Sequence, residues 1–325
     1  MNEIQFEIWN RLVSGESLDG LNPARIDGRI DMRTIRVAEP IVTRTLQTPI
    51  GEARVLSGLT IIRNGSWREL DFTGATLPGL RLYYTTVRDC KFDECQLDRL
   101  RMWATDFRNV SFQRADLRGA VMGAAVDGRG DTYHAVDFTG ADLRNTIHGD
   151  SAFVNCLFSD TRLTRVHFRG SNFTDCVFDG ELREVIFSRD GLYPGKYPPN
   201  EMINVDLRKA QLRWCEFRSL DMDRVLYPED DEHVVIDEYS GTLERLIAHL
   251  ESDGGAAAGG LAAAYKNKLR WSGRHQRYGV LNRRDAADCV GVDSAGQLID
   301  LLDGWGVLRA TQEVNAMDPK DRLLP

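Results

Sequence analysis

The residues of this chain that could bind a metal or act as nucleophiles are its six cysteines and six histidines. Zinc sites and redox pairs are usually marked by closely spaced cysteines or by clustered histidine and cysteine. The sequence has no Cys-x-x-Cys, and its histidines are scattered. Five cysteines share one setting, two residues before a large apolar residue: Cys90, Cys95, Cys156, Cys176 and Cys215. We interpret them as small buried hydrophobic residues, with a metal site or stacked disulfide as the alternative.

Motifs of catalysis are absent from the sequence. It contains no GxxxxGK[ST], no HExxH, no GxSxG and no GxGxxG that joins a strand to a helix. Its many carboxylates are flanked by arginine or lysine, which is typical of a solvated surface. The sequence therefore predicts a protein that is not an enzyme and that binds neither a cofactor nor a metal.

The cysteine setting belongs to a five-residue period that runs from Ile62 to Tyr227. Large apolar residues occupy every fifth position in three blocks, 62–122, 138–187 and 207–227, and a small residue stands two positions before most of them. The polar exception at such a centre is His148. It is either a hydrogen-bonded histidine of the core or the mark of a register shift that turns Ile147 inward.

A period of five fits neither a 3.6-residue helix nor a long two-residue alternation. In an extended chain residues i and i−2 point to the same side, so the large and the small residue face inward together. The chain must then turn a corner after each repeat, and four sides close a coil of about twenty residues. The predicted fold is an all-β solenoid, a right-handed quadrilateral parallel β-helix.

The repeat resembles the A(D/N)LXX consensus of the pentapeptide-repeat protein family, through groups that include Ala115-Asp116-Leu117, Ala141-Asp142-Leu143, Ser171-Asn172-Phe173 and Val205-Asp206-Leu207. The resemblance covers about half of the chain and implies the same β-helix. Some members of the family, including quinolone-resistance and toxin-immunity types, bind DNA gyrase and offer it a rod that resembles a DNA duplex. A subgroup with two loops that project from the coil is similar in layout to this chain.

Three segments follow from these patterns. Residues 1–59 are expected to hold a helix at 3–13 and strands that lead into or cap the first coil, because an open coil end exposes unpaired strand edges. Residues 60–227 form the β-helix. Residues 228–325 form an α-helical tail, with helices at 240–250, 261–278, 283–290 and 294–303 and a flexible linker at 253–260. The basic helix at 261–278 is interpreted as a solvated face, with a nucleic-acid patch as the alternative.

The repeat breaks twice, at 123–135 and 188–204, where glycine, proline and aspartate favour loops. Loops on a rigid scaffold often carry binding residues. The candidate partner-binding residues are therefore Arg129, Asp131 and Tyr133 in the first loop and Tyr193, Lys196 and Tyr197 in the second. Tolerated insertions without function, or an irregular coil at 188–204, are the alternatives. The Arg-Gly-Asp string at 129–131 is interpreted as a chance match to a cell-adhesion motif.

Charge and hydropathy limit the partners. The net charge is −8, yet residues 60–227 carry 23 basic and 24 acidic groups, so the acidic excess lies mainly in the tail. This balance does not predict direct binding of nucleic acid. No apolar run is long enough for a membrane span and the N-terminus lacks the pattern of a signal peptide, so a cytoplasmic location is expected.

Two functions are consistent with the sequence. The first is a scaffold or adaptor that holds a protein partner through its loops or tail. The second is a protein that binds gyrase or another type II topoisomerase and protects it from poisons by DNA mimicry. Mimicry requires the outward aspartates to gather on one face, and they do not share one twenty-residue phase: Asp71, Asp106, Asp116, Asp137, Asp142, Asp206 and Asp221. A homodimer through an end of the solenoid is a further expectation.

Overall fold

The computed structural model describes residues 2–48, 51–123, 126–192, 194–253, 256–272 and 276–317. The chain divides into two compact units, Met1–Phe168 and Arg169–Pro325. The division falls inside the repeats, so each unit contains coils of the β-helix. The segments 1–59, 60–227 and 228–325 remain a prediction about domains.

The first unit contains one helix and short strands, most of them of two or three residues: α1 (Glu3–Ser14), β1 (Arg25–Ile26), β2 (Arg29–Asp31), β3 (Ile41–Thr48), β4 (Gly51–Ser57), β5 (Ile61–Arg63), β6 (Ser66–Arg68), β7 (Leu70–Asp71), β8 (Arg81–Tyr83), β9 (Thr86–Arg88), β10 (Arg101–Trp103), β11 (Asp106–Ser111), β12 (Val121–Met122), β13 (Thr132–Asp137), β14 (Ile147–Gly149), β15 (Ala152–Val154), β16 (Leu157–Ser159) and β17 (Leu163–Thr164). Strand β18 (His167–Arg169) ends at the division.

The second unit contains further coil strands and then a mixed α/β region: β19 (Asn172–Thr174), β20 (Val177–Arg183), β21 (Ile186–Ser188), β22 (Val205–Asp206), β23 (Ala210–Arg213), β24 (Glu216–Arg218), β25 (Val225–Leu226), β26 (His233–Ile236), α2 (Tyr239–Asp253), α3 (Ala256–Trp271), β27 (Gly279–Asn282), α4 (Arg283–Val290), α5 (Val292–Gly304), β28 (Leu308–Ala310) and α6 (Thr311–Ala316).

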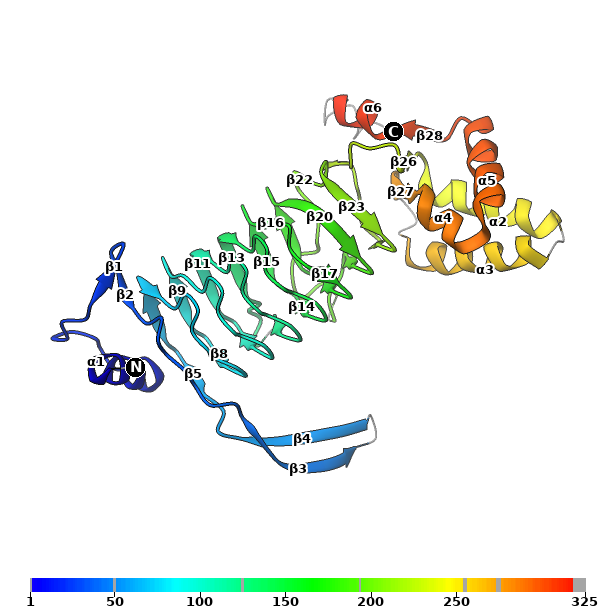
Figure 1. Cartoon of the computed structure of the whole chain (residues 1–325). Helices are drawn as coiled ribbons and strands as arrows, with labels where there is room; N and C mark the ends of the chain where they lie inside the picture. Colours follow the sequence, from blue (N-terminus) through cyan, green and yellow to red (C-terminus); the bar gives the residue numbers. More distant parts are fainter. Residues whose placement is uncertain are drawn as a thin grey trace. The chain divides into compact units, whose positions relative to one another are not determined.

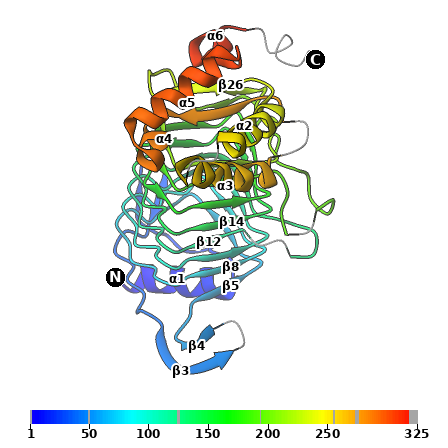
Figure 2. The same cartoon turned by 90° about the vertical axis from the view of Figure 1, so that its right-hand side faces the viewer.

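Strands of the first unit stack in parallel with a twenty-residue register, as the repeat predicts. Ile62 pairs with Leu82, Leu82 with Met102 and Met102 with Met122. Figure 2 shows β5, β8, β12 and β14 one above the other on one side of the coils. The parallel β-helix predicted from the sequence is confirmed.

Aromatic rings form a column inside the first unit. Phe72, Phe92, Phe112, Phe138 and Phe158 are buried and stack on successive coils with ring centroids 5.0–5.4 Å apart. This distance is close to the spacing of neighbouring strands, about 4.8 Å, so each ring meets its equivalent in the next coil. The core is therefore an ordered stack in which one coil determines what fits in the next.

Most of the described corners of the coil are formed by a residue in the left-handed conformation, two positions after the inward centre. Asn64, Asp89 and Asn109 illustrate the pattern, with φ of 54°, 54° and 52°. Glycine, asparagine and aspartate tolerate this conformation best, whereas other residues are disfavoured by roughly 1–2 kcal/mol. Ala135 is such a residue, with φ of 52°.

The N-terminal end of the coil is covered as expected. Helix α1 begins with a capping box between Asn2 and Gln5, and Trp9 packs against Trp67 with ring centroids 6.2 Å apart. Backbone of the preceding segment pairs with the first coil, for example from Ile30 N to Glu69 O at 2.7 Å. Strands β3 and β4 were also expected to lead into or cap the coil, but they pair with each other as a hairpin that projects from it (Figure 1).

The two breaks in the repeat are shorter than predicted. Tyr133 pairs with Phe107 and with Phe153, so it is an inward centre and the first insertion ends before Asp131. In the second break Ile203 forms a bridge to Thr174, and Met202 is fully buried. Residues 200–204 therefore belong to a coil, and the second loop is limited to about 189–199.

The C-terminal part of the second unit is more than a helical tail. The helices expected at 240–250, 283–290 and 294–303 are confirmed as α2, α4 and α5. Strands β27, β26 and β28 form an antiparallel sheet in that order, which the sequence reading missed. The expected linker at 253–260 is wrong for 256–260, which begin α3, and the expected helix at 261–278 ends at Trp271.

The last coil strands and this sheet are joined within the second unit by side chains that act in place of a further strand. Asn282 Nδ2 donates to Leu212 O at 2.8 Å, and Leu212 N donates to His233 Nε2 at 3.2 Å. Asn315 binds both the N–H and the C=O of Tyr227, at 2.8 and 2.9 Å. These edge groups are already satisfied, so dimerisation through this end of the solenoid receives no support.

The corner geometry predicts that Ala135→Gly stabilises the protein, by about 0.5–1 kcal/mol, because glycine removes the left-handed penalty at an exposed position. Urea unfolding followed by circular dichroism measures the change. The matched control is Ala152→Gly in β15, where glycine should destabilise by a similar amount because the strand is extended. Equal destabilisation by both substitutions would contradict the corner argument.

Candidate interaction surface

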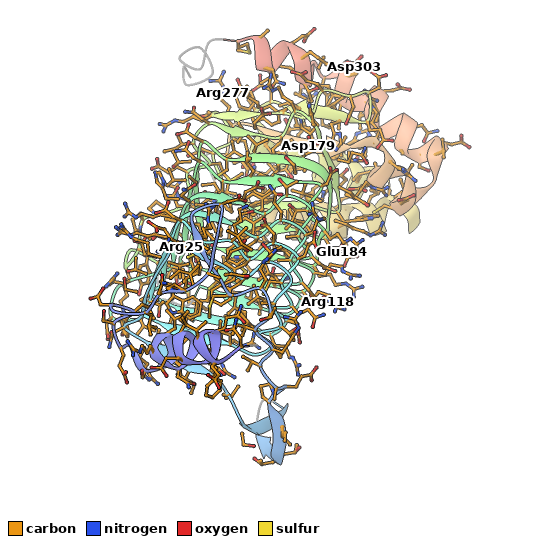
Figure 3. All side chains as sticks on the ribbon, turned by 60° about the vertical axis from the view of Figure 1, so that its left-hand side comes forward. Arg25, Arg118, Asp179, Glu184, Arg277 and Asp303 are labelled. Atoms are coloured by element: carbon orange, nitrogen blue, oxygen red, sulfur yellow. The ribbon has the colours of Figure 1, made fainter. Side chains whose placement is uncertain are left out.

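Carboxylates on the coil surface of the first unit are neutralised by arginines two residues further along the same segment. The ion pairs are Arg108 to Asp106 at 3.1 Å, Arg118 to Asp116 at 2.5 Å and Arg144 to Asp142 at 2.6 Å. Arg118 projects outward from the ribbon in Figure 3. In β11 residues i and i+2 lie on the same side, which explains the Asp106–Arg108 pair. At Asp116 and Asp142 the carboxylate also accepts from the backbone N–H of the same arginine, in a local turn.

The other outward aspartates are also engaged. Asp71 is buried and accepts from Thr73 N, Asp137 accepts from Thr139 N, Asp206 pairs with Arg208 at 2.8 Å and Asp221 lies 3.6 Å from Arg189.

One face of the first unit combines arginines with stacked aromatic rings, and we call it the arginine–aromatic face: Arg63, Arg81, Tyr83, Arg101 and Trp103 on β5, β8 and β10. The three rungs that build it, 59–64, 79–84 and 99–104, contain no acidic residue. Among the residues that the structure describes, no carboxylate lies within ion-pair distance of these three arginines. The face therefore carries uncompensated positive charge.

Stacking orders the side chains of the arginine–aromatic face. The rings of Tyr83 and Trp103 are parallel within 3° and 4.4 Å apart, and the guanidinium of Arg63 lies 4.3 Å above the Tyr83 ring. Arg101 donates to Gly119 O at 2.7 Å, which fixes its position. Burial and the neighbouring charges of Arg81 and Arg99 lower the pKa of Arg101. These side chains remain partly exposed and are held in place before any partner arrives.

The first-loop candidates separate into exposed and buried residues. Arg129 is exposed at a tight turn, where its backbone pairs with Val126, and the turn is held by a 2.6 Å hydrogen bond from Tyr84 to Asp127. Asp131 and Tyr133 are fully buried. Their assignment as partner-binding residues is wrong, because both point into the coil as members of the repeat.

The second-loop candidates are less completely described. Lys196 is exposed and lies 5.9 Å from the partly exposed Tyr197 ring. Tyr193 falls outside the described residues. Lys196 and Tyr197 remain candidates for partner contact, as Arg129 does in the first loop.

Burial shifts the pKa values of polar residues inside the first unit. His148 is fully buried beside Thr146 Oγ1, at 3.1 Å, and burial lowers its pKa to about 3. It occupies the inward position while Ile147 is half exposed, so the core-histidine interpretation holds and the register shift is wrong. Asp131 accepts from Thr105 N at 2.7 Å, yet burial raises its pKa to about 7.

The cysteines match the interpretation as small buried residues. Cys90, Cys95, Cys156 and Cys176 are buried, Cys215 is partly buried, and none of the six cysteines is joined in a disulfide. Burial raises the pKa of Cys90 to about 12, so its thiolate is not available at neutral pH. Among the described residues, no three histidine, cysteine, aspartate or glutamate side chains are grouped as a metal site would require.

Helix α5 of the second unit does not contribute to a basic surface. Helices α4 and α5 are adjacent, joined at Gly291, but α5 contains no lysine or arginine and exposes Asp293, Asp300 and Asp303. These carboxylates would repel the phosphates of nucleic acid. A cavity of this unit, beside Arg218, Lys268 and Trp271, encloses about 40 Å³, close to the volume of one water molecule and too small for a metabolite.

No helix in the described part of the chain is both long and apolar enough to span a membrane.

Comparison with known proteins identifies the repeat. The pentapeptide-repeat family model matches residues 88–123 and 137–175 with eight copies. No curated protein sequence matches the chain. Among solved structures, HetL of Nostoc sp. strain PCC 7120, involved in heterocyst differentiation regulation, is 14% identical, with 52% of this chain and 90% of HetL covered and a TM-score of 0.29.

Two further solved structures are similar to parts of the chain. Rfr23 of Cyanothece 51142 is 10% identical, with 37% of this chain and 91% of Rfr23 covered and a TM-score of 0.29. Full-length QnrB1, a plasmid-mediated fluoroquinolone resistance protein, is 15% identical, with 48% and 84% covered and a TM-score of 0.16.

Burial of His148 predicts a loss of stability in acid. Its pKa is about 3 in the folded protein and near 6.5 when unfolded, so the unfolded chain binds the extra proton between these values. His148→Phe should remove this penalty. Its free energy of unfolding should therefore rise by about 2–3 kcal/mol relative to the wild type when the pH falls from 7 to 4.5. Urea unfolding at both pH values measures it, and the exposed His134→Gln is the control. A difference in unfolding free energy between His148→Phe and the wild type that is the same at both pH values would show that burial does not lower the pKa of His148.

Asp131 should have the opposite pH dependence. Its pKa is raised from 3.8 to about 7, so the folded protein holds the proton and stability falls as pH rises through this window. Asp131→Asn keeps an acceptor for Thr105 N. Its free energy of unfolding should rise by about 2–3 kcal/mol relative to the wild type when the pH rises from 5 to 8. The control is Asp160→Asn at an exposed corner, in the same unfolding experiment. A gain that does not grow with pH would show that the carboxyl is ionised in the folded protein.

Proposed function

We propose that this pentapeptide-repeat protein is a non-enzymatic scaffold that binds a protein partner through the arginine–aromatic face of its β-helix. The observation that carries the proposal is the contrast between this face and its neighbours. Asp106, Asp116 and Asp142 are each bound to an arginine, whereas Arg63, Arg81 and Arg101 have no carboxylate partner among the described residues. Arginine, tyrosine and tryptophan are also the residues enriched where binding energy concentrates in interfaces.

Rigidity supports a role in binding. Every rung of the face is hydrogen-bonded to the rungs beside it, and the centres Ile62, Leu82 and Met102 beneath it are buried. Little conformational entropy is then lost when a partner docks, which lowers the free-energy cost of association. The interior of these coils is filled by the buried apolar centres.

The loops supply secondary contacts in this proposal. Arg129 is exposed beside a turn that is anchored to Tyr84, and Tyr84 directly follows Tyr83 of the face. Lys196 and Tyr197 of the second loop belong to the other unit and are separate candidate contacts. A partner that meets both the face and the turn at Arg129 would be bound more tightly than through either contact alone.

Binding to a DNA topoisomerase by DNA mimicry is less well supported. Mimicry needs a surface of exposed negative charge, and the outward aspartates of the coils are held by arginines or by backbone amides. The proposed partner surface has the opposite sign.

Site-specific photo-crosslinking in the native host tests the scaffold proposal. A photoreactive amino acid in place of Ile61, which is 40% exposed on β5 of the face, should capture one discrete protein. The same group in place of Ser66 on β6, the neighbouring face, is the control and should capture none. Adding Arg63→Gln and Arg81→Gln should abolish the Ile61 adduct, because both cations are lost.

Two outcomes would contradict the proposal. Equal capture from the Ile61 and Ser66 positions would show that the face has no special role. Protection of gyrase against a fluoroquinolone by micromolar protein, unchanged by Arg63→Gln and Arg81→Gln, would favour topoisomerase binding through another surface.

A further inference from the structure

We infer that the arginine–aromatic face recognises an extended, acidic segment of the partner protein, an inference that rests on the proposed function. The first step of the argument concerns charge. Arg81 and Arg101 are paired residues of neighbouring parallel strands. Their backbones lie about 4.8 Å apart, so two positively charged side chains are neighbours. Like charges placed opposite each other destabilise a sheet. A carboxylate bound between them would relieve this repulsion and form charge-assisted hydrogen bonds.

Geometry favours a planar, two-oxygen anion over a spherical one. Arginine presents its donors as a fixed fork that matches a carboxylate. Arg101 is already oriented by its hydrogen bond to Gly119 O, and Arg63 by the Tyr83 ring beneath it. Arg63 therefore lies on the Tyr83 ring, and Arg101 comes two residues before Trp103 on β10.

The spacing along each strand indicates an extended ligand. Arg81 and Tyr83 lie on the same side of β8, two residues and therefore about 6.6–6.8 Å apart. Alternate side chains of an extended peptide have the same spacing. A peptide that lies along β8 and β10 would place a glutamate or aspartate on Arg81 and Arg101 and its next same-side residue against the Tyr83–Trp103 stack.

Charge elsewhere in the protein favours a short acidic peptide over nucleic acid. The chain has a net charge of −8, and the face supplies three arginines. Binding of nucleic acid relies on neutralising many phosphates and releasing their counterions, which needs a broader basic surface. A peptide with two or three carboxylates matches the charge that is available.

Fluorescence anisotropy with the full-length protein tests the inference, with a fluorescein-labelled octapeptide of alternating glutamate and threonine as the probe. We expect saturable binding, with a dissociation constant that rises at least tenfold in Arg63→Gln plus Arg81→Gln. The matched control is Arg68→Gln plus Lys91→Gln, which removes the same charge from neighbouring rungs and should change the constant less than twofold. Circular dichroism and the melting temperature confirm that both variants fold.

Further arms separate the alternatives. An octapeptide of alternating lysine and threonine should not bind. An eight-nucleotide oligothymidylate that binds more tightly than the acidic peptide, and that loses affinity in Arg63→Gln plus Arg81→Gln, would overturn the inference in favour of nucleic acid. Equal effects of the two double variants would overturn it in favour of non-specific charge attraction.

The result also distinguishes this inference from the proposed function. If the acidic peptide does not bind while the crosslinker at Ile61 still captures a protein, the scaffold role is supported and the inference that the partner segment is acidic is wrong. If the peptide binds through Arg63 and Arg81 while no protein is captured at Ile61, recognition of acidic segments stands and the scaffold role in the host is wrong.

Discussion

Parallel backbone pairing at one constant spacing is the constraint on which each unit depends. Because every coil repeats the path of the one before it, equivalent residues meet equivalent residues on the next rung. Phe72, Phe92 and Phe112 stack for this reason, as do Ile62, Leu82 and Met102. A residue in this fold is therefore judged by the column to which it belongs as well as by its neighbours along the chain.

The same rule organises the surface. Where aspartate is followed by arginine two residues later, as at Asp116 and Arg118, the two side chains form an ion pair and their charges cancel. Where an arginine is paired with an arginine on the next rung, as at Arg81 and Arg101, stacking places uncompensated positive charges side by side. The arginine–aromatic face thus differs from its neighbours through the order of residues within three rungs, although the composition of the coils is almost balanced.

Coil ends need a different solution, because stacking leaves the last backbone groups without a partner. In the first unit α1 and the segment before β5 cover the initial coil, with Trp9 on Trp67 and backbone pairing at Glu69. In the second unit the side chains of Asn282 and Asn315 occupy the positions that another strand would take. Asn282 ends β27 of the C-terminal sheet and Asn315 lies on α6, so the sheet and this helix both take part in capping the solenoid.

The sequence by itself determined the β-helix, its inward residues and the buried state of Cys90 and His148, because the five-residue period is local and repeats many times. It could not place Tyr133 or Met202, since insertions interrupt the period before each of them and the surrounding polar residues suggest loops. The strands of the C-terminal sheet were missed because each has only three or four residues.

Which face lacks charge compensation was decided by tertiary structure. The aspartate–arginine pairs are local, two residues apart, but only stacking places Arg81 beside Arg101, which comes twenty residues later in the sequence. The sequence thus determined the scaffold, and stacking decided which of its faces is left free to bind.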